Sequence, residues 1–130
     1  KSIKNREYAA IICNFANGDM VGHTGNIDAS IKAVEVLDEC MGMITEAILE
    51  VSGDCLITAD HGNVEKLRDE QSGQSLTSHT DGPVPLVYVG KQTLKLKADG
   101  SLSDIAPSLL SLMHLDQPDE MTGHTLIEFT

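Results

Sequence analysis

An apolar stripe through residues 27–51 constrains the fold more than any other feature of this chain. Apolar residues recur there at steps of three and four, which places them on one face of a long helix. Asn26 stands where the N-cap belongs, Asp28 suits the positive end of the helix dipole, and Ser52-Gly53 supplies a stop. Gly42 costs roughly 1 kcal/mol against alanine, which so continuous a stripe tolerates. The stripe consists of Ile27, Ile31, Val34, Leu37, Met41, Ile44, Ile48 and Val51.

Short apolar runs on either side of this helix are typical of buried strands. We predict strands at residues 9–15, 55–59 and 84–89, an exposed strand or hairpin over 91–100, and a last helix capped by Ser103. The polar segment 68–81 is predicted to be a surface loop. This order of strands and helices predicts an α/β fold, with a layered sheet that carries helices on its faces. At 130 residues the chain fits one domain.

The balance of charges limits what the chain can bind. Its formal net charge of −11 argues against a nucleic-acid or membrane-surface binder. The same field repels a phosphate- or carboxylate-bearing substrate unless metal ions or basic groups elsewhere offset it. Cys13, Cys40 and Cys55 are widely spaced and form no C-x-x-C motif, which predicts small buried thiols. We find no signal peptide or transmembrane run and therefore expect a reducing cytoplasm.

Acidic residues and histidines lie beside the ends of the predicted strands. In open α/β sheets, ligands gather beyond the carboxyl ends of the strands, so we expect these side chains to lie near one another. Imidazole nitrogen and carboxylate oxygen together suit Mn²⁺, Zn²⁺, Co²⁺ or Fe²⁺ better than Ca²⁺ or Mg²⁺. The pattern therefore predicts a site for divalent metal ions, and for more than one of them. The residues concerned are Asp19, His23, Asp60, His61 and His79.

Structural roles for the same residue types stay open at this point. An Asp-His pair after a strand more often forms a turn or a cap than a metal site. A single histidine in a polar loop, such as His79, is more often a surface residue. His114, near a predicted helix C-terminus, is explained by the helix dipole, and His124 is structural by default. Spacing alone does not decide between these roles and metal binding.

The full strings around these residues carry a family resemblance. Residues 19–25, Asp-Met-Val-Gly-His-Thr-Gly, closely resemble the first metal motif of the cofactor-independent phosphoglycerate mutases. Residues 58–63 with the glutamate that follows are similar to the second motif of that family, and residues 78–80 to its third. Residues 103–110 and 120–123 resemble its C-terminal helix and tail. The first motif is specific, whereas Asp-His-Gly alone occurs across the alkaline phosphatase superfamily.

This resemblance implies an alkaline-phosphatase-like α/β fold and a ligand set. By resemblance, Asp19, His23 and His79 bind one Mn²⁺. Asp60 and His61 bind a second Mn²⁺, together with an aspartate and a nucleophilic serine for which this chain has no matching motif. Co²⁺ or Zn²⁺ are alternatives to Mn²⁺. In the family the serine takes the phosphoryl group from 3-phosphoglycerate and returns it to the 2-position, and no 2,3-bisphosphoglycerate is needed.

Residues 1–130 resemble only the C-terminal portion of the family's metal-binding phosphatase-like domain. The motif of the nucleophilic serine and the arginine-rich substrate-binding domain have no counterpart here, and the chain opens at Lys1 without a methionine. We therefore expect an incomplete domain that contains no catalytic nucleophile and is inactive alone. The resemblance implies a monomeric, cytoplasmic, glycolytic parent protein that binds phosphoglycerate, with no nucleic-acid or membrane partner.

Two alternatives to a mutase remain from the residues. One is another enzyme of the same superfamily, such as a phosphopentomutase or a metal-dependent phosphodiesterase, which the string at residues 19–25 disfavours. The other is a non-catalytic, acidic module that keeps the metal ligands for stability. Replacement of His79 by alanine tests this module, because lost stability without any effect on turnover in the parent protein would favour the module over an enzyme.

Overall fold

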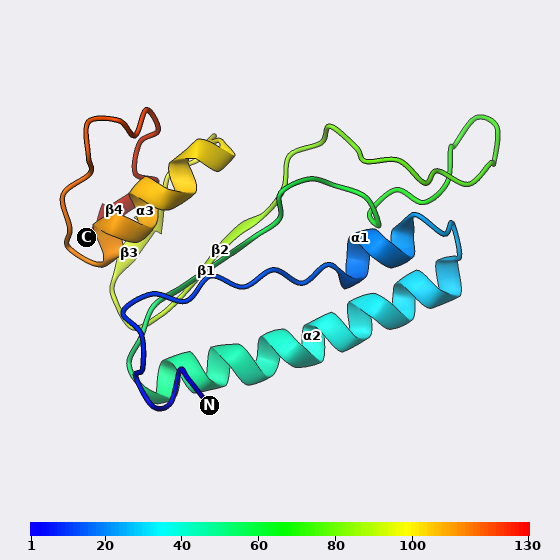
Figure 1. The fold of residues 1–130 in the computed structure, drawn as a ribbon. Helices are drawn as coiled ribbons and strands as arrows, with labels where there is room; N and C mark the ends of the chain where they lie inside the picture. The colour runs from blue at the N-terminus through cyan, green and yellow to red at the C-terminus, as the bar shows by residue number, and fades with distance from the viewer.

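The computed structural model describes all residues, 1–130, as a mixed α/β arrangement (Figure 1). A long helix lies along one side of a two-stranded ribbon, and a smaller helix with a second ribbon lies at one end. The elements in chain order are α1 (Asn17–Gly22), α2 (Ile27–Glu50), β1 (Cys55–Thr58), β2 (Leu86–Val89), β3 (Leu94–Leu96), η1 (Leu102–Asp104), α3 (Ile105–Leu112) and β4 (Ile127–Phe129).

Helix α2 confirms the prediction made from the apolar stripe. The Asn26 side chain accepts a hydrogen bond of 3.0 Å from the Ala29 N–H, as an N-cap does. At the other end, Ser52 takes a positive φ of 53°, and the Gly53 N–H donates to the Ile48 carbonyl at 2.9 Å. The helix contacts both α1 and β2. Helix α2 therefore connects α1 with the β1–β2 ribbon.

Strands β1 and β2 pair in antiparallel register, with Cys55 opposite Val89 and Thr58 opposite Leu86. At one end of this ribbon, the Asp54 carboxylate accepts hydrogen bonds from the Tyr88 hydroxyl at 2.5 Å and from the Gln92 amide at 2.8 Å. Beyond the other end, the segment that follows β1 meets the segment that precedes β2, since an isolated bridge pairs Gly62 with Thr80. The predicted strands 55–59 and 84–89 are thus confirmed, one to two residues shorter.

The predicted buried strand at residues 9–15 is wrong. This segment makes no backbone hydrogen bond, and Ile12 is 91% exposed. It runs extended between β1 and α2 (Figure 1). A strand exists only where a neighbour pairs with it, and here β1 pairs with β2. The prediction of buried thiols is wrong for the same region, because Cys13 is exposed, while the other two cysteines are half-buried.

The C-terminal unit differs from the prediction in two respects. Residues 91–100 contain a strand, as one of the two predicted alternatives has it, but β3 pairs antiparallel with β4 and forms no hairpin within that segment. Helix α3 is led by the turn η1, whose N-cap is Ser101 and not Ser103. Ser101 and Asp104 form a capping box, in which the Ser101 N–H donates to the Asp104 carboxylate at 2.8 Å. Asp104 also accepts a hydrogen bond from the His124 N–H at 2.7 Å, which ties the tail to the start of the helix.

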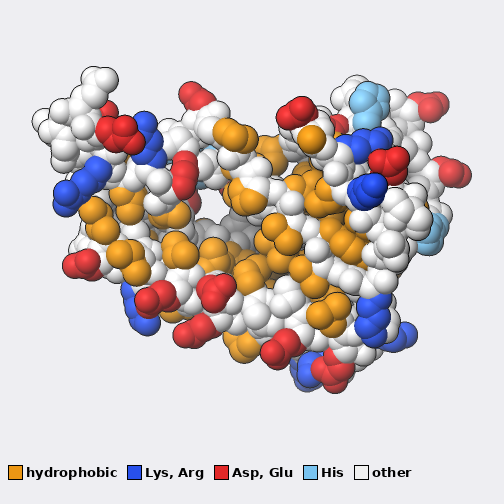
Figure 2. All heavy atoms as spheres, turned by 180° about the vertical axis from the view of Figure 1, so that it is seen from behind, with side chains coloured by type: hydrophobic (Ala, Val, Ile, Leu, Met, Phe, Trp, Pro, Cys, Tyr) orange, Lys and Arg blue, Asp and Glu red, His pale blue; other side chains and the backbone are white.

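Much apolar surface is left uncovered. Only nine of the 130 residues are buried, and large side chains such as Ile31, Val34 and Met43 are exposed. Figure 2 shows hydrophobic side chains gathered across a hollowed face, with charged side chains mostly around its rim. None of the helices combines the length and the apolar character that a membrane crossing requires.

Replacement of two glycines by alanine is expected to change the free energy of unfolding in opposite directions. A Cβ at Gly123 would collide with the Ser103 carbonyl, lying 2.6 Å from its carbon, so Gly123→Ala should lower the free energy of unfolding by about 1–3 kcal/mol. A Cβ at Gly42 meets nothing within 4 Å, so Gly42→Ala should raise it by about 1 kcal/mol through helix propensity. Urea unfolding of both variants checks this pair. Equal effects would contradict the close contact of the tail with η1.

Candidate metal centre

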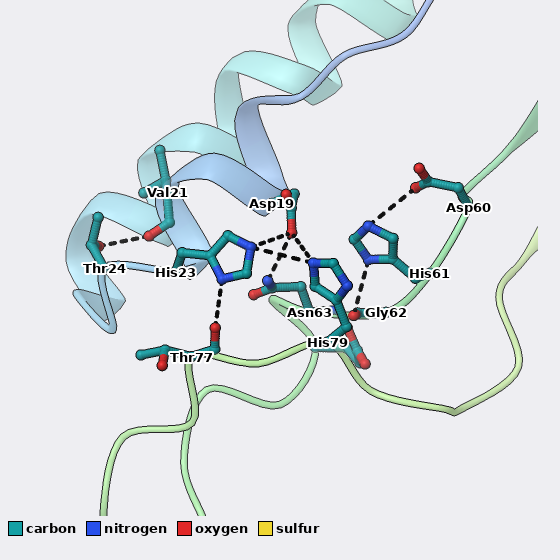
Figure 3. Close-up of polar contacts among 11 residues, drawn as sticks. Asp19, Val21, His23, Thr24, Asp60, His61, Gly62, Asn63, Thr77 and His79 are labelled. Atoms are coloured by element: carbon teal, nitrogen blue, oxygen red, sulfur yellow. Dashed lines mark hydrogen bonds and ion pairs between the residues drawn. The ribbon is translucent and has the colours of Figure 1, made fainter.

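Three segments from different parts of the chain meet at one end of the β1–β2 ribbon (Figure 3). Asp19 lies in α1 and His23 is the C-cap of that helix, four residues further on, which places both side chains on one face. The sequence analysis predicts no helix at this position, because Asn17-Gly18 is a pair typical of turns, and here it begins α1 instead. His61 follows β1 and His79 precedes β2, and the antiparallel pairing brings them to the same place.

Asp19, His23 and His79 form the centre of the cluster. The Asp19 Oδ1 atom lies 3.1 Å from His23 Nε2 and 3.0 Å from His79 Nε2. The two Nε2 atoms lie 3.3 Å from each other. Each residue thus turns one ligand-type atom toward a common point. Of the five residues that the sequence singled out, the structure brings these three together most closely.

The tautomer of His23 is fixed by the backbone. Its Nδ1 lies 2.6 Å from the Thr77 carbonyl oxygen, which can only accept a hydrogen bond, so Nδ1 carries the proton. The Nε2 atom of His23 then presents a lone pair to the centre of the cluster. A backbone carbonyl behind an imidazole is a common way to orient a metal-binding histidine.

The donor set fits a divalent ion. Lone pairs that converge at 3.0–3.3 Å repel one another unless a proton or a cation lies between them. Two donors held about 2.0–2.2 Å from one ion lie roughly 3.0–3.4 Å apart, which agrees with this spacing. Two imidazole nitrogens with one carboxylate oxygen favour a transition-metal ion over Ca²⁺.

Asp60 and His61 lie beside this cluster rather than within it. The His61 Nε2 atom is 3.7 Å from Asp60 Oδ1, and the Asp60 side chain is 70% exposed. The His61 ring stacks on the His79 ring, with centroids 3.6 Å apart and planes 17° from parallel. The two residues therefore offer a carboxylate and an imidazole next to the first cluster (Figure 3).

The electrostatic surroundings keep Asp19 ionised. Desolvation is the largest single influence and acts to raise the pKa of Asp19. The nearby His23, the hydrogen bond from Asn63 and the nearby His79 act together in the opposite direction, and the net effect is a lowered pKa. A carboxylate that stays charged toward lower pH is suited to hold a cation.

Three polar residues behind the ligands were not assigned roles from the sequence. The Asn63 amide donates to Asp19 Oδ1 at 3.0 Å, and the Asn63 N–H donates to the Glu65 carboxylate at 2.6 Å. The Thr80 hydroxyl donates to the same carboxylate, and this hydrogen bond is the main reason for the lowered pKa of Glu65. All three lie inside or next to the strings that carry the family resemblance, which is the signal that could have found them.

The two remaining histidines lie outside the cluster. His114 has a positive φ of 54° at the end of α3, and its ring centroid lies 5.6 Å from that of Phe129. His124 is exposed on the tail, where its N–H donates to Asp104. Neither belongs to the group of converging donors, in agreement with the structural roles expected for them.

Comparison with known proteins gives a consistent set of relatives. A model of the metalloenzyme superfamily matches residues 1–125. The chain is similar to the 2,3-bisphosphoglycerate-independent phosphoglycerate mutases of Ectopseudomonas mendocina and Hahella chejuensis, each 58% identical over 127 residues. Those matches cover 98% of this chain but only 25% and 24% of the relatives. The chain thus spans about a quarter of the length of the curated relatives it matches.

A solved structure shows the same fold. The crystal structure of Leishmania mexicana phosphoglycerate mutase, determined at low cobalt concentration, matches this chain with a TM-score of 0.88 and 32% sequence identity. The match covers 99% of this chain and 26% of that one. The α/β class and the prediction of an incomplete domain are confirmed by this match.

Proposed function

Because the chain belongs to the metalloenzyme superfamily, we propose that it is the metal-binding part of a 2,3-bisphosphoglycerate-independent phosphoglycerate mutase. The observation that carries this proposal is the convergence of Asp19, His23 and His79 on one point. Similarity to named mutases along nearly the whole chain supports it. We further propose that residues 1–130 are the C-terminal portion of the phosphatase-like domain of that enzyme.

The proposed ligand sets follow the two groups of side chains. Asp19, His23 and His79 hold one Mn²⁺, with Co²⁺ or Zn²⁺ as alternatives. Asp60 and His61 hold the second ion together with groups that this chain does not supply. When bound, the two ions would supply Lewis-acid stabilisation to the oxygens of a phosphoryl group.

Other contacts within the chain orient the ligand side chains of this site. The Thr77 carbonyl holds the His23 ring with its proton on Nδ1, so that Nε2 is free to bind. Stacking of His61 on His79 fixes the spacing between the two groups of ligands. With 9 basic and 20 acidic residues, the chain cannot attract an anionic phosphoglycerate by its own charge. The bound ions and basic groups elsewhere in the parent protein must therefore do so.

The proposed reaction interconverts 3-phosphoglycerate and 2-phosphoglycerate. The nucleophilic serine of the parent protein, for which this chain has no matching motif, takes the phosphoryl group from the 3-oxygen. The 2-hydroxyl of the retained glycerate then takes the phosphoryl group from the serine. The phosphoryl group lost from one oxygen is gained by the other, so no 2,3-bisphosphoglycerate enters. Since the serine and the substrate clamp are not among these residues, the 130-residue chain alone should be inactive. We expect a monomeric, cytoplasmic parent enzyme of glycolysis.

The proposal is tested by turnover in the parent protein. Conversion of 3-phosphoglycerate to 2-phosphoglycerate, measured without 2,3-bisphosphoglycerate, should be abolished by EDTA and restored by Mn²⁺. The 130-residue chain loaded with Mn²⁺ is the matched control and should give no turnover. A parent protein that binds Mn²⁺ and folds but does not convert phosphoglycerate would point to another phosphate ester or to a non-catalytic metal-binding module.

A further inference from the structure

Asn63 is a buried amide that lies directly behind the Asp19 carboxylate. The residue is 5% exposed, and its Nδ2 donates to Asp19 Oδ1 at 3.0 Å (Figure 3). Its other amide atom, Oδ1, is buried and has no hydrogen-bond partner. A native structure seldom leaves a buried polar atom unpaired, because the lost hydration costs free energy. This cost indicates that the amide serves the hydrogen bond that its Nδ2 atom donates to Asp19.

The orientation of this amide follows from its partner. The Nδ2 atom of Asn63 donates to the Asp19 carboxylate, so the NH₂ group of the amide faces the cluster. The oxygen of Asn63 then points away from the cluster. If the role of Asn63 were to fill space, an apolar side chain of the same shape would fill it without an unpaired oxygen.

Gly22 leaves the room that this amide occupies. A Cβ at Gly22 would overlap Asn63 Oδ1 and lie 2.8 Å from Asn63 Cγ. Gly22 is helical and lies in the last turn of α1, where alanine is otherwise the better residue. Asn63 can approach this closely only because Gly22 has no side chain, and Gly22 stands between Asp19 and His23 in the sequence.

From this geometry we infer that Asn63, seated against Gly22, is the positioning residue that aims the Asp19 carboxylate at the metal. The inference rests on the proposed metal site of Asp19, His23 and His79. Asn63 acts through Asp19 and does not itself belong to the group of converging donors. Hydrogen bonds behind metal ligands are worth about 10–100-fold in metal affinity.

The test separates metal affinity from stability in the full protein. Asn63→Leu keeps the shape of the side chain but removes the donor and the unpaired oxygen. We expect Mn²⁺ affinity, measured by calorimetry, to fall about 10–100-fold, while the melting temperature in EDTA is not lowered. The visible absorption spectrum of the Co²⁺-loaded variant should differ from that of the unaltered protein. The matched control is Asn26→Ala, which removes the cap of α2 and should lower the melting temperature without weakening Mn²⁺ binding.

A second variant keeps the inference testable if Asn63→Leu folds poorly. Gly22→Ala should displace the Asn63 amide and weaken Mn²⁺ binding. In a protein that already contains Asn63→Ala, which lacks the amide, Gly22→Ala should weaken Mn²⁺ binding little further. Unchanged Mn²⁺ affinity and an unchanged Co²⁺ spectrum in both Asn63→Leu and Gly22→Ala would overturn the positioning role. Absence of Mn²⁺ binding by the unaltered, folded protein would instead overturn the proposed metal site, and the positioning role with it.

Discussion

Replacement of His79 by alanine is expected to weaken Mn²⁺ binding more than about 100-fold. The substitution removes one of three donors that converge on one point, and even groups behind metal ligands are worth about 10–100-fold. The affinity is measured by calorimetric titration of the metal-free protein. His124→Ala is the matched control, because this exposed histidine lies outside the cluster, and its Mn²⁺ affinity should not change.

Stacking on His61 is a second role of His79, and it can be separated from metal binding. His79→Phe keeps an aromatic ring over His61 but has no Nε2 atom. It should therefore bind Mn²⁺ as weakly as His79→Ala while unfolding closer to the temperature of the unaltered protein. Normal Mn²⁺ affinity in the phenylalanine variant would show that His79 supports the site by packing alone and is not a ligand.

Mn²⁺ affinity is also expected to fall steeply as the solution is acidified through the range in which imidazoles protonate, about pH 6.5 in model peptides. An imidazole must be neutral to bind a metal, so each ligating histidine contributes up to about tenfold per pH unit below that range. Asp19 does not take part in this loss. Its pKa is lowered, so its charge is fully present above the ordinary aspartate range and is lost only on acidification below it.

Calorimetry at a series of pH values from about one unit below 6.5 to about one unit above it gives the slope. The unaltered protein should show a steeper dependence than His79→Ala, because the variant has one imidazole fewer to protonate. A flat profile in the unaltered protein would contradict histidine ligation. Identical slopes in the two proteins would remove His79 from the ligand set.

The sequence predicted those elements whose stability comes from their own residues. Helix α2 has a cap, an apolar stripe and a stop within one segment, and the structure forms the helix with that cap and that stop. The strand expected at 9–15 has the right composition but no neighbour, so its apolar side chains are exposed. The pairing of β3 with β4 joins segments about thirty positions apart, and alternation within one segment carries no information about such a partner.

The types of ligand in the candidate site could be predicted from the sequence, but the helix and the buried amide that position them could not. Residue types and their place beside strand ends indicated five candidate ligands, and the family resemblance grouped Asp19, His23 and His79. The structure brings these three together. Helix α1 was missed because Asn17-Gly18 is a strong turn signal, although tertiary contacts with α2 favour a helix. The role of Asn63 depends on its burial against Gly22, which only the packed structure makes visible.

The contact between His23 and His79 joins residues 56 positions apart, and this separation has a consequence for folding. Closing a loop of that length costs about 3–4 kcal/mol of chain entropy before any contact within it forms. The helix and the ribbon inside the loop can form from nearer contacts, so the cluster should be assembled last and opened first. An ion held there would act as a removable cross-link that binds only the closed chain. The supply of free metal would then set how much of the chain is folded, as well as whether the site can work.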